Sequence, residues 1–138
     1  MPNRKEIGRE EARDMVARVG DRLDAQGRGA AVAVVDAHGE LVAFLRTDAC
    51  RLPSITIAIH KAFTAAREGV GSGVLGERSR REGFPLGNFG DPRYVGWGGG
   101  VPIVVDGAVI GAVGVSGLAE ADDVELARWA ATGLAATG

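Results

Sequence analysis

The sequence contains few of the residues from which proteins build covalent or metal-centred sites. Its 138 residues include one cysteine, Cys50, so no disulfide can form within the chain. The two histidines, His38 and His60, are too few for a zinc site made by this protein alone. No GK[ST] phosphate-binding loop is present. Chemistry that depends on a disulfide, a protein-only zinc ion or a P-loop is therefore not expected.

The chain also lacks the features of proteins that bind nucleic acids or membranes. It has 16 Lys and Arg against 18 Asp and Glu, a formal net charge of -2, so it has no basic footprint for nucleic acid. No apolar run approaches the roughly 18 residues of a membrane span. Residues 1–14 are charged and contain no apolar segment of a secretory signal. We expect a cytoplasmic protein without nucleic-acid or membrane partners.

What the sequence does contain is typical of a globular protein. Hydrophobic residues make up 46% and charged residues 25%, close to average usage. The length predicts one domain, residues 1–138. Glycine is abundant, with 22 residues, many of them between Gly69 and Gly117. We expect these glycines to shape loops and close contacts.

Apolar residues at helical spacing predict helices at about residues 9–26, 53–68 and 119–134. Gly69 is positioned to end the second helix. Residues 70–100 are glycine-rich and weakly periodic, so we expect a long loop with one helical turn near residues 77–81. A loop of this length in a compact domain usually serves a function.

Two β-hairpins are predicted between these helices. Runs of β-forming residues at 31–35 and 41–46 flank a turn at 36–39, and a second hairpin is centred on Asp106-Gly107. Small residues after that turn permit the close approach of another backbone or of a ligand: Gly111, Ala112 and Gly114. Hairpins with helices before, between and after them indicate an α/β (α+β) fold in which helices cover an antiparallel sheet.

His60 is the first candidate for chemistry. On the predicted helix it lies with Lys61 and Thr64 off the apolar stripe. An imidazole on a helix can bind a metal or haem iron, or transfer protons near neutral pH. A structural or solvent-exposed histidine would show the same pattern. Cys50 is either a nucleophile with a lowered pKa or a small buried side chain.

Two further groups could contact a ligand. Arg46 and Asp48 stand at the end of the second predicted strand, where they could form an ion pair or present charge to a carboxylate. Trp97 precedes Gly98-Gly99-Gly100, which places an aromatic ring beside backbone amides. That combination suits a flat or anionic ligand, although a tight turn has the same sequence. The basic cluster of Arg78, Arg80 and Arg81 lies between Glu77 and Glu82, and we interpret it as a solvated face in preference to a phosphate site.

Ordered motifs in the chain resemble those of the GlcG/HbpS-like family, which includes the C-terminal domain of PduO-type proteins. The first half contains Arg46-Thr47-Asp48, Ser54-Ile55-Thr56-Ile57-Ala58 and Lys61-Ala62-Phe63-Thr64-Ala65. The second half contains Gly99-Gly100-Val101-Pro102-Ile103, Asp106-Gly107, Gly111-Ala112-Val113-Gly114-Val115-Ser116-Gly117 and Asp123. The resemblance covers roughly residues 10 to 135.

This resemblance implies a profilin-like, three-layer α/β/α fold with a central antiparallel sheet. It also implies a homo-oligomer, either a dimer or a larger assembly. Some members of the family bind haem, others are linked to cobalamin or diol metabolism, and others look like enzymes of small-molecule metabolism. The chain departs from the family pattern at Ala49, Cys50, Pro53 and His60, so the ligand cannot be carried over from the family name.

Three hypotheses remain open. The first is a protein that binds haem, another tetrapyrrole or another small molecule, with His60 as metal ligand and Trp97 and Phe89 as flat contacts. The second is a cofactor-independent enzyme for a small carboxylated metabolite, with His60 or Asp123 as acid/base and the amides of residues 98–100 stabilising charge. The third is an assembly scaffold. The residues expected to bind the ligand are Arg46, Asp48, Lys61, Thr64, Trp97, Gly99, Gly100 and Ser116.

Overall fold

The computed structural model describes the backbone of residues 6–137 and the side chains as far as residue 133. Its centre is a four-stranded sheet in the order β2-β1-β4-β3, in which all neighbouring strands are antiparallel. The strands are β1 (Ala31–Asp36), β2 (Leu41–Arg46), β3 (Gly100–Val105) and β4 (Ala108–Ser116). Both predicted hairpins are present, and the predicted central antiparallel sheet is confirmed.

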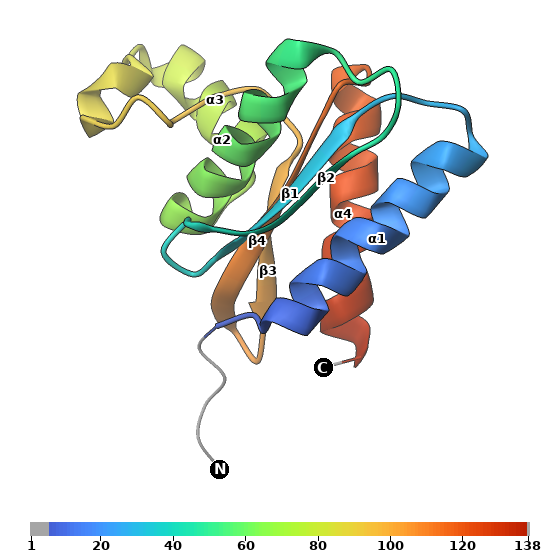
Figure 1. Ribbon diagram of the computed structural model, residues 1–138. Coiled ribbons are helices and arrows are strands. Elements are labelled where there is room, and N and C mark those ends of the chain that lie inside the picture. The colour runs from blue at the N-terminus through green and yellow to red at the C-terminus, as the bar shows by residue number, and fades with distance from the viewer. Residues whose placement is uncertain (1–5, 138) are drawn as a thin grey trace.

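Helices cover both faces of the sheet, which gives the expected three α/β/α layers (Figure 1). One face carries α1 (Arg9–Ala25) and α4 (Glu120–Thr137), and the other carries α2 (Leu52–Glu68) and α3 (Ser72–Glu82). In this part of the chain no helix is long and apolar enough to cross a membrane.

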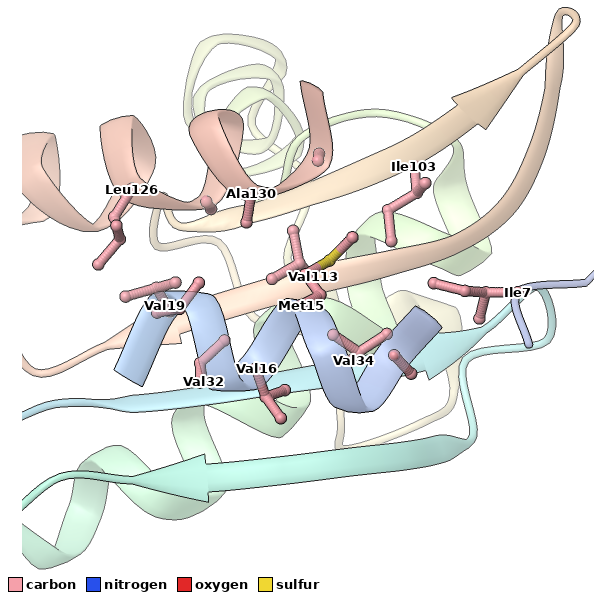
Figure 2. Close-up of a cluster of buried hydrophobic side chains, with 14 of the residues drawn as sticks. Ile7, Met15, Val16, Val19, Val32, Val34, Ile103, Val113, Leu126 and Ala130 are labelled. Carbon is pink, nitrogen blue, oxygen red and sulfur yellow. The ribbon is translucent and has the colours of Figure 1, made fainter. Parts of the chain in front are cut away.

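The larger hydrophobic core lies beneath α1 and α4. The apolar stripe of α1, which includes Met15 and Val19, packs against β-branched residues of the two central strands, such as Val32 and Val113 (Figure 2). Leu126 closes the core from α4. Each such side chain stabilises the fold by about 1.5–3 kcal/mol when it is fully buried. This layer anchors α4 and therefore fixes the position of its first turn.

The opposite core is built from small residues, which bring α2 unusually close to the sheet. Ala31 and Ala33 face Ala58 and Ala62 across this layer. Gly114 lies where the contact is tightest, because a Cβ there would stand 2.1 Å from the carbonyl oxygen of Ala58. The predicted close approach along β4 is thus made by the backbone of α2. It places the inner face of α2 directly over the strands.

The segment from residue 70 to 100 differs from the predicted long loop. It contains the 11-residue helix α3 and a short 3₁₀ helix, η1 (Leu86–Phe89). Only Ser72, Leu75 and Gly76 of α3 are buried, too few to produce a clear apolar period. A Cβ at Gly76 would stand 2.0 Å from the carbonyl oxygen of Gly96, so this glycine allows helix packing and does not mark a loop.

Candidate functional site

Lys61 and Asp123 form a buried ion pair between α2 and α4. Lys61 Nζ donates to Asp123 Oδ2 at 3.1 Å and to the carbonyl oxygen of Val115 at 3.0 Å. The side chains of the pair are 3% and 4% exposed. Asp123 Oδ1 accepts a hydrogen bond from the amide of Leu118 at 3.1 Å. The pair therefore connects α2, the end of β4 and the start of α4.

Burial acts on the Asp123 carboxyl of this pair. It raises the pKa of the Asp123 carboxyl above its ordinary value, while the Lys61 ammonium and the neighbouring amides oppose that rise. Gly99 packs against the pair with a φ of +128°, and a Cβ at this position would stand 2.9 Å from Lys61 Nζ. The glycine predicted to bind a ligand thus lets the loop close over the ammonium.

A pocket of about 360 Å³ opens beside the ion pair, and we call it the lysine pocket. Its walls come from the first turns of α2 and α4, the end of β4 and the loop that carries Trp97. The lining residues are Arg51, Pro53, Ser54, Ile57, Lys61, Trp97, Ser116, Gly117, Leu118, Glu120 and Asp123. Four residues named from the sequence therefore meet here: Lys61, Trp97, Ser116 and Asp123.

Two features of the lysine pocket suit an anionic ligand. The first turn of α2 contains no acidic residue and has no side-chain cap, so no side chain of α2 itself compensates its positive dipole end. Ser54 and Ser116 are only 7% and 5% exposed, and among the described residues neither hydroxyl has a hydrogen-bond partner. No buried side-chain polar atom of the described residues lacks a partner, so both hydroxyls reach the open space of the pocket, where they can donate to a ligand.

His60 lies on another side of α2, although it is next to Lys61 in sequence. It is half-buried and lines neither the lysine pocket nor the larger pocket described below. Burial lowers the pKa of His60 below 6.5, the nearby Arg93 lowers it further, and Asp91 opposes them. The imidazole is therefore neutral at physiological pH. The sequence placed His60, Lys61 and Thr64 together off the buried stripe, whereas Lys61 and Thr64 are buried.

The Thr64 hydroxyl both donates and accepts a hydrogen bond within the fold. Its Oγ1 donates to the carbonyl oxygen of His60 at 2.8 Å and accepts from the amide of Val95 at 3.0 Å. The side chain is fully buried. Thr64 therefore fastens the segment that precedes Trp97 to α2, and it supports the pocket wall without facing the pocket.

The remaining predicted residues are dispersed. Arg46 and Asp48 line a separate pocket of about 220 Å³ beside α1. The Gly98 amide donates to Glu120 and the Gly100 amide to Ser72, so these amides are not available to stabilise a developing charge. Phe89 stacks on the ring of Tyr94 at 4.4 Å and does not join Trp97 at the lysine pocket.

The structure also bears on the predicted reactivity of Cys50 and on the predicted metal site. Burial raises the pKa of the Cys50 thiol, which is opposite to the change that activates a nucleophile. Within residues 6–137 no group of three or more His, Cys, Asp and Glu side chains is arranged to hold a metal ion. Of the residues that the structure describes, no His, Cys, Met or Tyr lines the lysine pocket or the larger one, so these residues present no common axial ligand for haem iron there.

Arg51 and Glu120 were not predicted from the sequence, and Ser54 was noted only as part of a motif. Helical spacing was a usable signal for Ser54, because residues 54, 57 and 61 fall on one face of a helix. All three line the lysine pocket. The contribution of Glu120 could not be found in this way, because it depends on a hydrogen bond to the distant Gly98 amide.

Two curated relatives share part of this sequence. GlcG of Escherichia coli strain K12 is 40% identical over 91 residues, which are 62% of this chain and 62% of GlcG. An uncharacterised 15.0 kDa protein of the dhaT-dhaS intergenic region of Citrobacter freundii is 36% identical over 86 residues, 61% of each chain. The matched region thus spans less than two thirds of these relatives.

Solved structures match nearly the whole chain. A double mutant of Streptomyces reticuli HbpS superposes with a TM-score of 0.85 at 27% identity, covering 97% of this chain and 90% of that one. PduOC, solved in complex with haem, gives a TM-score of 0.80 at 25% identity and covers 92% and 94%. The family model described as haem degrading protein HbpS-like matches residues 7–132. The chain therefore belongs to the HbpS-like family.

Proposed function

We propose that this protein binds a small carboxylate-bearing molecule in the lysine pocket. One observation carries the proposal: two serine hydroxyls without a partner among the described residues and a buried ion pair line a single pocket. The volume of about 360 Å³ is at the small end of the range typical of ligand sites. A short-chain metabolite fits this space better than a drug-sized molecule.

The proposed binding mode follows from the position of the charges. The ligand carboxylate lies at the first turn of α2, where the helix dipole and Arg51 favour an anion. The hydroxyls of Ser54 and Ser116 donate to it or to a second polar group. The flat side chain of Trp97, which is 57% exposed, covers the ligand on its solvent side. The Lys61–Asp123 pair holds the polar end that lies deepest.

Calorimetric titration with a panel of short hydroxy-, keto- and dicarboxylic acids tests this proposal, with the matched primary amides as uncharged controls. We expect saturable binding of at least one acid and none of its amide. Ser116→Ala removes a hydrogen bond to a charged group, which is worth about 1.5–3 kcal/mol, and should weaken binding by at least tenfold. Arg51→Gln should weaken it severalfold, whereas Arg13→Gln on α1 should have no effect.

The proposal fails if no acid binds, or if acid and amide bind equally. It also fails if Ser116→Ala leaves the affinity unchanged, because the unpaired hydroxyl is the group that argues for a ligand. The fold should tolerate this substitution, since the hydroxyl has no hydrogen bond within the described residues.

Acid–base catalysis at the same site is a second candidate, favoured by the raised pKa of Asp123. A carboxyl with a raised pKa beside an ammonium group is a common arrangement at catalytic sites. Asp123 would exchange a proton with a bound hydroxy or keto acid, and Lys61 would stabilise the charge that develops on oxygen. Deuterium exchange into bound acids, followed by NMR, tests this role, with Asp123→Asn as the inactive variant.

Haem binding is a further candidate, supported by the similarity to PduOC in its complex with haem. Among the described residues, none of the three pockets presents a common axial ligand for haem iron, so we assign that role to His60, which is half-buried on α2. The lowered pKa of His60 keeps the imidazole neutral, as a metal ligand requires. Such a haem would need cover from a second copy of the chain, in line with the predicted homo-oligomer.

A haemin titration followed by the Soret band tests this candidate. His60→Ala should abolish a saturable Soret shift, whereas His38→Ala, in which the exposed hairpin histidine is removed, should not. An equal response of both variants would remove His60 as the ligand. Light scattering with and without haemin shows whether a second copy is needed.

A further inference from the structure

A second and larger pocket lies along the open edge of the sheet, and we call it the edge pocket. Its volume is about 610 Å³. β3 is one of the two edge strands of the sheet, and the pocket is formed where α3 and α4 flank the start of this strand. Of the described residues, only Glu120 lines both this pocket and the lysine pocket, so the edge pocket is a separate site.

The backbone of β3 cannot readily accept another strand at this edge. The amide of Val115 donates to the Gly99 carbonyl, and hydrogen-bonded pairs alternate along an antiparallel ladder. Gly100 and Pro102 therefore direct their backbone groups toward the open edge. The Gly100 amide is already bonded to Ser72, and proline has no amide to offer. An added peptide strand is thus disfavoured, which leaves the pocket to a different kind of occupant.

The charges of the edge pocket favour an anion. Arg78 of α3 and Arg128 of α4 both line it, and in the described part of the chain neither has a carboxylate partner. The two acidic residues of the lining are occupied: Glu77 pairs with Arg80 at 2.9 Å, and Glu120 accepts the Gly98 amide at 2.7 Å. Two guanidinium groups on opposite helices are therefore available to an incoming anion.

The surface between these arginines is apolar. Val74 of α3 is 56% exposed, and Val101 and Val124 continue the same lining from β3 and α4. An isolated exposed valine needs no explanation, whereas a contiguous apolar surface inside a concave pocket marks a binding site. An apolar surface with a guanidinium group on each side is complementary to an amphipathic anion.

We propose that the edge pocket binds an amphipathic carboxylate, such as a medium-chain fatty acid or a hydrophobic aromatic acid. The apolar body lies against Val74, Val101 and Val124. The carboxylate pairs with Arg78 or Arg128. This ligand class is distinct from the short polar acids assigned to the lysine pocket, and the two sites can be tested independently.

Methyl-resolved NMR with octanoate as the probe tests this site in the full chain. We expect saturable shifts of the methyl groups of Val74, Val101 and Val124, and much weaker binding of octanol. The Arg78→Gln/Arg128→Gln double variant should weaken octanoate binding by about tenfold, because it removes both charge-assisted partners. Arg13→Gln and Ser116→Ala should leave octanoate binding unchanged.

Any one of several results would overturn the proposal. The proposal fails if the valine methyls do not respond at millimolar octanoate, if octanol binds as well as octanoate, or if the double variant binds octanoate normally. A response of these methyls to protein concentration alone would assign the pocket to a contact between two copies and would also overturn it. Loss of octanoate binding in Ser116→Ala, with the double variant unaffected, would move the site to the lysine pocket.

Discussion

The two pockets use charge in opposite ways. In the lysine pocket, Lys61 and Asp123 are buried and are held by fixed protein partners. In the edge pocket, Arg78 and Arg128 lie nearer to solvent and have no carboxylate partner in the described structure. A buried charge is costly unless it is paired. The lysine pocket should therefore be coupled to the stability of the fold, whereas the edge pocket should not.

Breaking the buried ion pair should have the largest effect on the free energy of unfolding. Lys61→Met leaves the Asp123 carboxylate buried without its cation, which costs about 3–5 kcal/mol. Because burial already raises the pKa of Asp123, the penalty for its charge should decrease as the pH falls and the carboxyl becomes protonated. Urea unfolding of the variant from pH 4 to 8 measures this trend.

The control is the double variant Lys61→Met/Asp123→Leu, in which no unpaired charge remains. It should recover much of the lost free energy of unfolding. Equal losses in the single and double variants would show that packing, and not charge, explains the role of the pair.

Moving α2 away from the sheet should have the next largest effect. Gly114→Ala introduces a Cβ at 2.1 Å from the carbonyl oxygen of Ala58, and overpacking of this kind costs about 1–3 kcal/mol. Binding in the lysine pocket should weaken as well, because α2 carries part of its lining. Gly87→Ala is the matched control, since nothing lies within 4 Å of the added carbon. Thermal unfolding measures the stability of both variants. Equal stability of Gly114→Ala and Gly87→Ala would contradict the close packing of α2 on β4.

His60 is half-buried, so we expect its effect on stability to lie between that of the Lys61–Asp123 pair and that of the edge-pocket arginines. Its pKa is below the unfolded value of 6.5, so its contribution to stability is fully present above pH 6.5 and is lost as the pH falls through the folded-state pKa. An NMR titration of the imidazole should give a pKa under 6.5. Arg93→Gln should raise that pKa but not restore it fully, because burial is the larger cause. A pKa unchanged by Arg93→Gln would contradict this assignment.

The smallest effect on stability is expected at the edge pocket. The Arg78→Gln/Arg128→Gln variant changes one half-buried and one exposed arginine, neither with a carboxylate partner in the described structure, so the free energy of unfolding should change by less than about 0.5 kcal/mol. Urea unfolding beside Lys61→Met gives the comparison directly. A loss comparable to that of Lys61→Met would mean that the edge pocket is also coupled to the fold.

Hydrophobic periodicity was sufficient to predict most of the fold but not α3. The stripes of α1 and α2 and the two hairpin turns are local patterns, and they appear at the expected places. α3 buries only three residues, and its glycines pack against Gly96 and Gly98 of a later loop. Such a contact is not encoded in the local pattern, so the segment resembled a loop.

The candidate site shows a similar limit. Lys61 and Asp123 were each predicted to be functional, but their pairing joins residues 62 positions apart. A buried lysine cannot be recognised from helical spacing, because spacing predicts burial only for apolar residues. His60 was grouped with Lys61 since the two are adjacent, whereas successive residues of a helix point in directions about 100° apart.

Ligand binding in the lysine pocket is tested most directly by following the two tryptophan indole N–H signals by NMR while a short carboxylic acid is added. Trp97 lines the lysine pocket, whereas Trp129 packs against Arg18 and Arg22 on another face and serves as an internal control. We expect a saturable shift of the Trp97 indole signal alone, and we expect Ser116→Ala to abolish that shift. A shift of Trp129 without Trp97, or no saturable shift with any acid of the panel, would contradict this prediction.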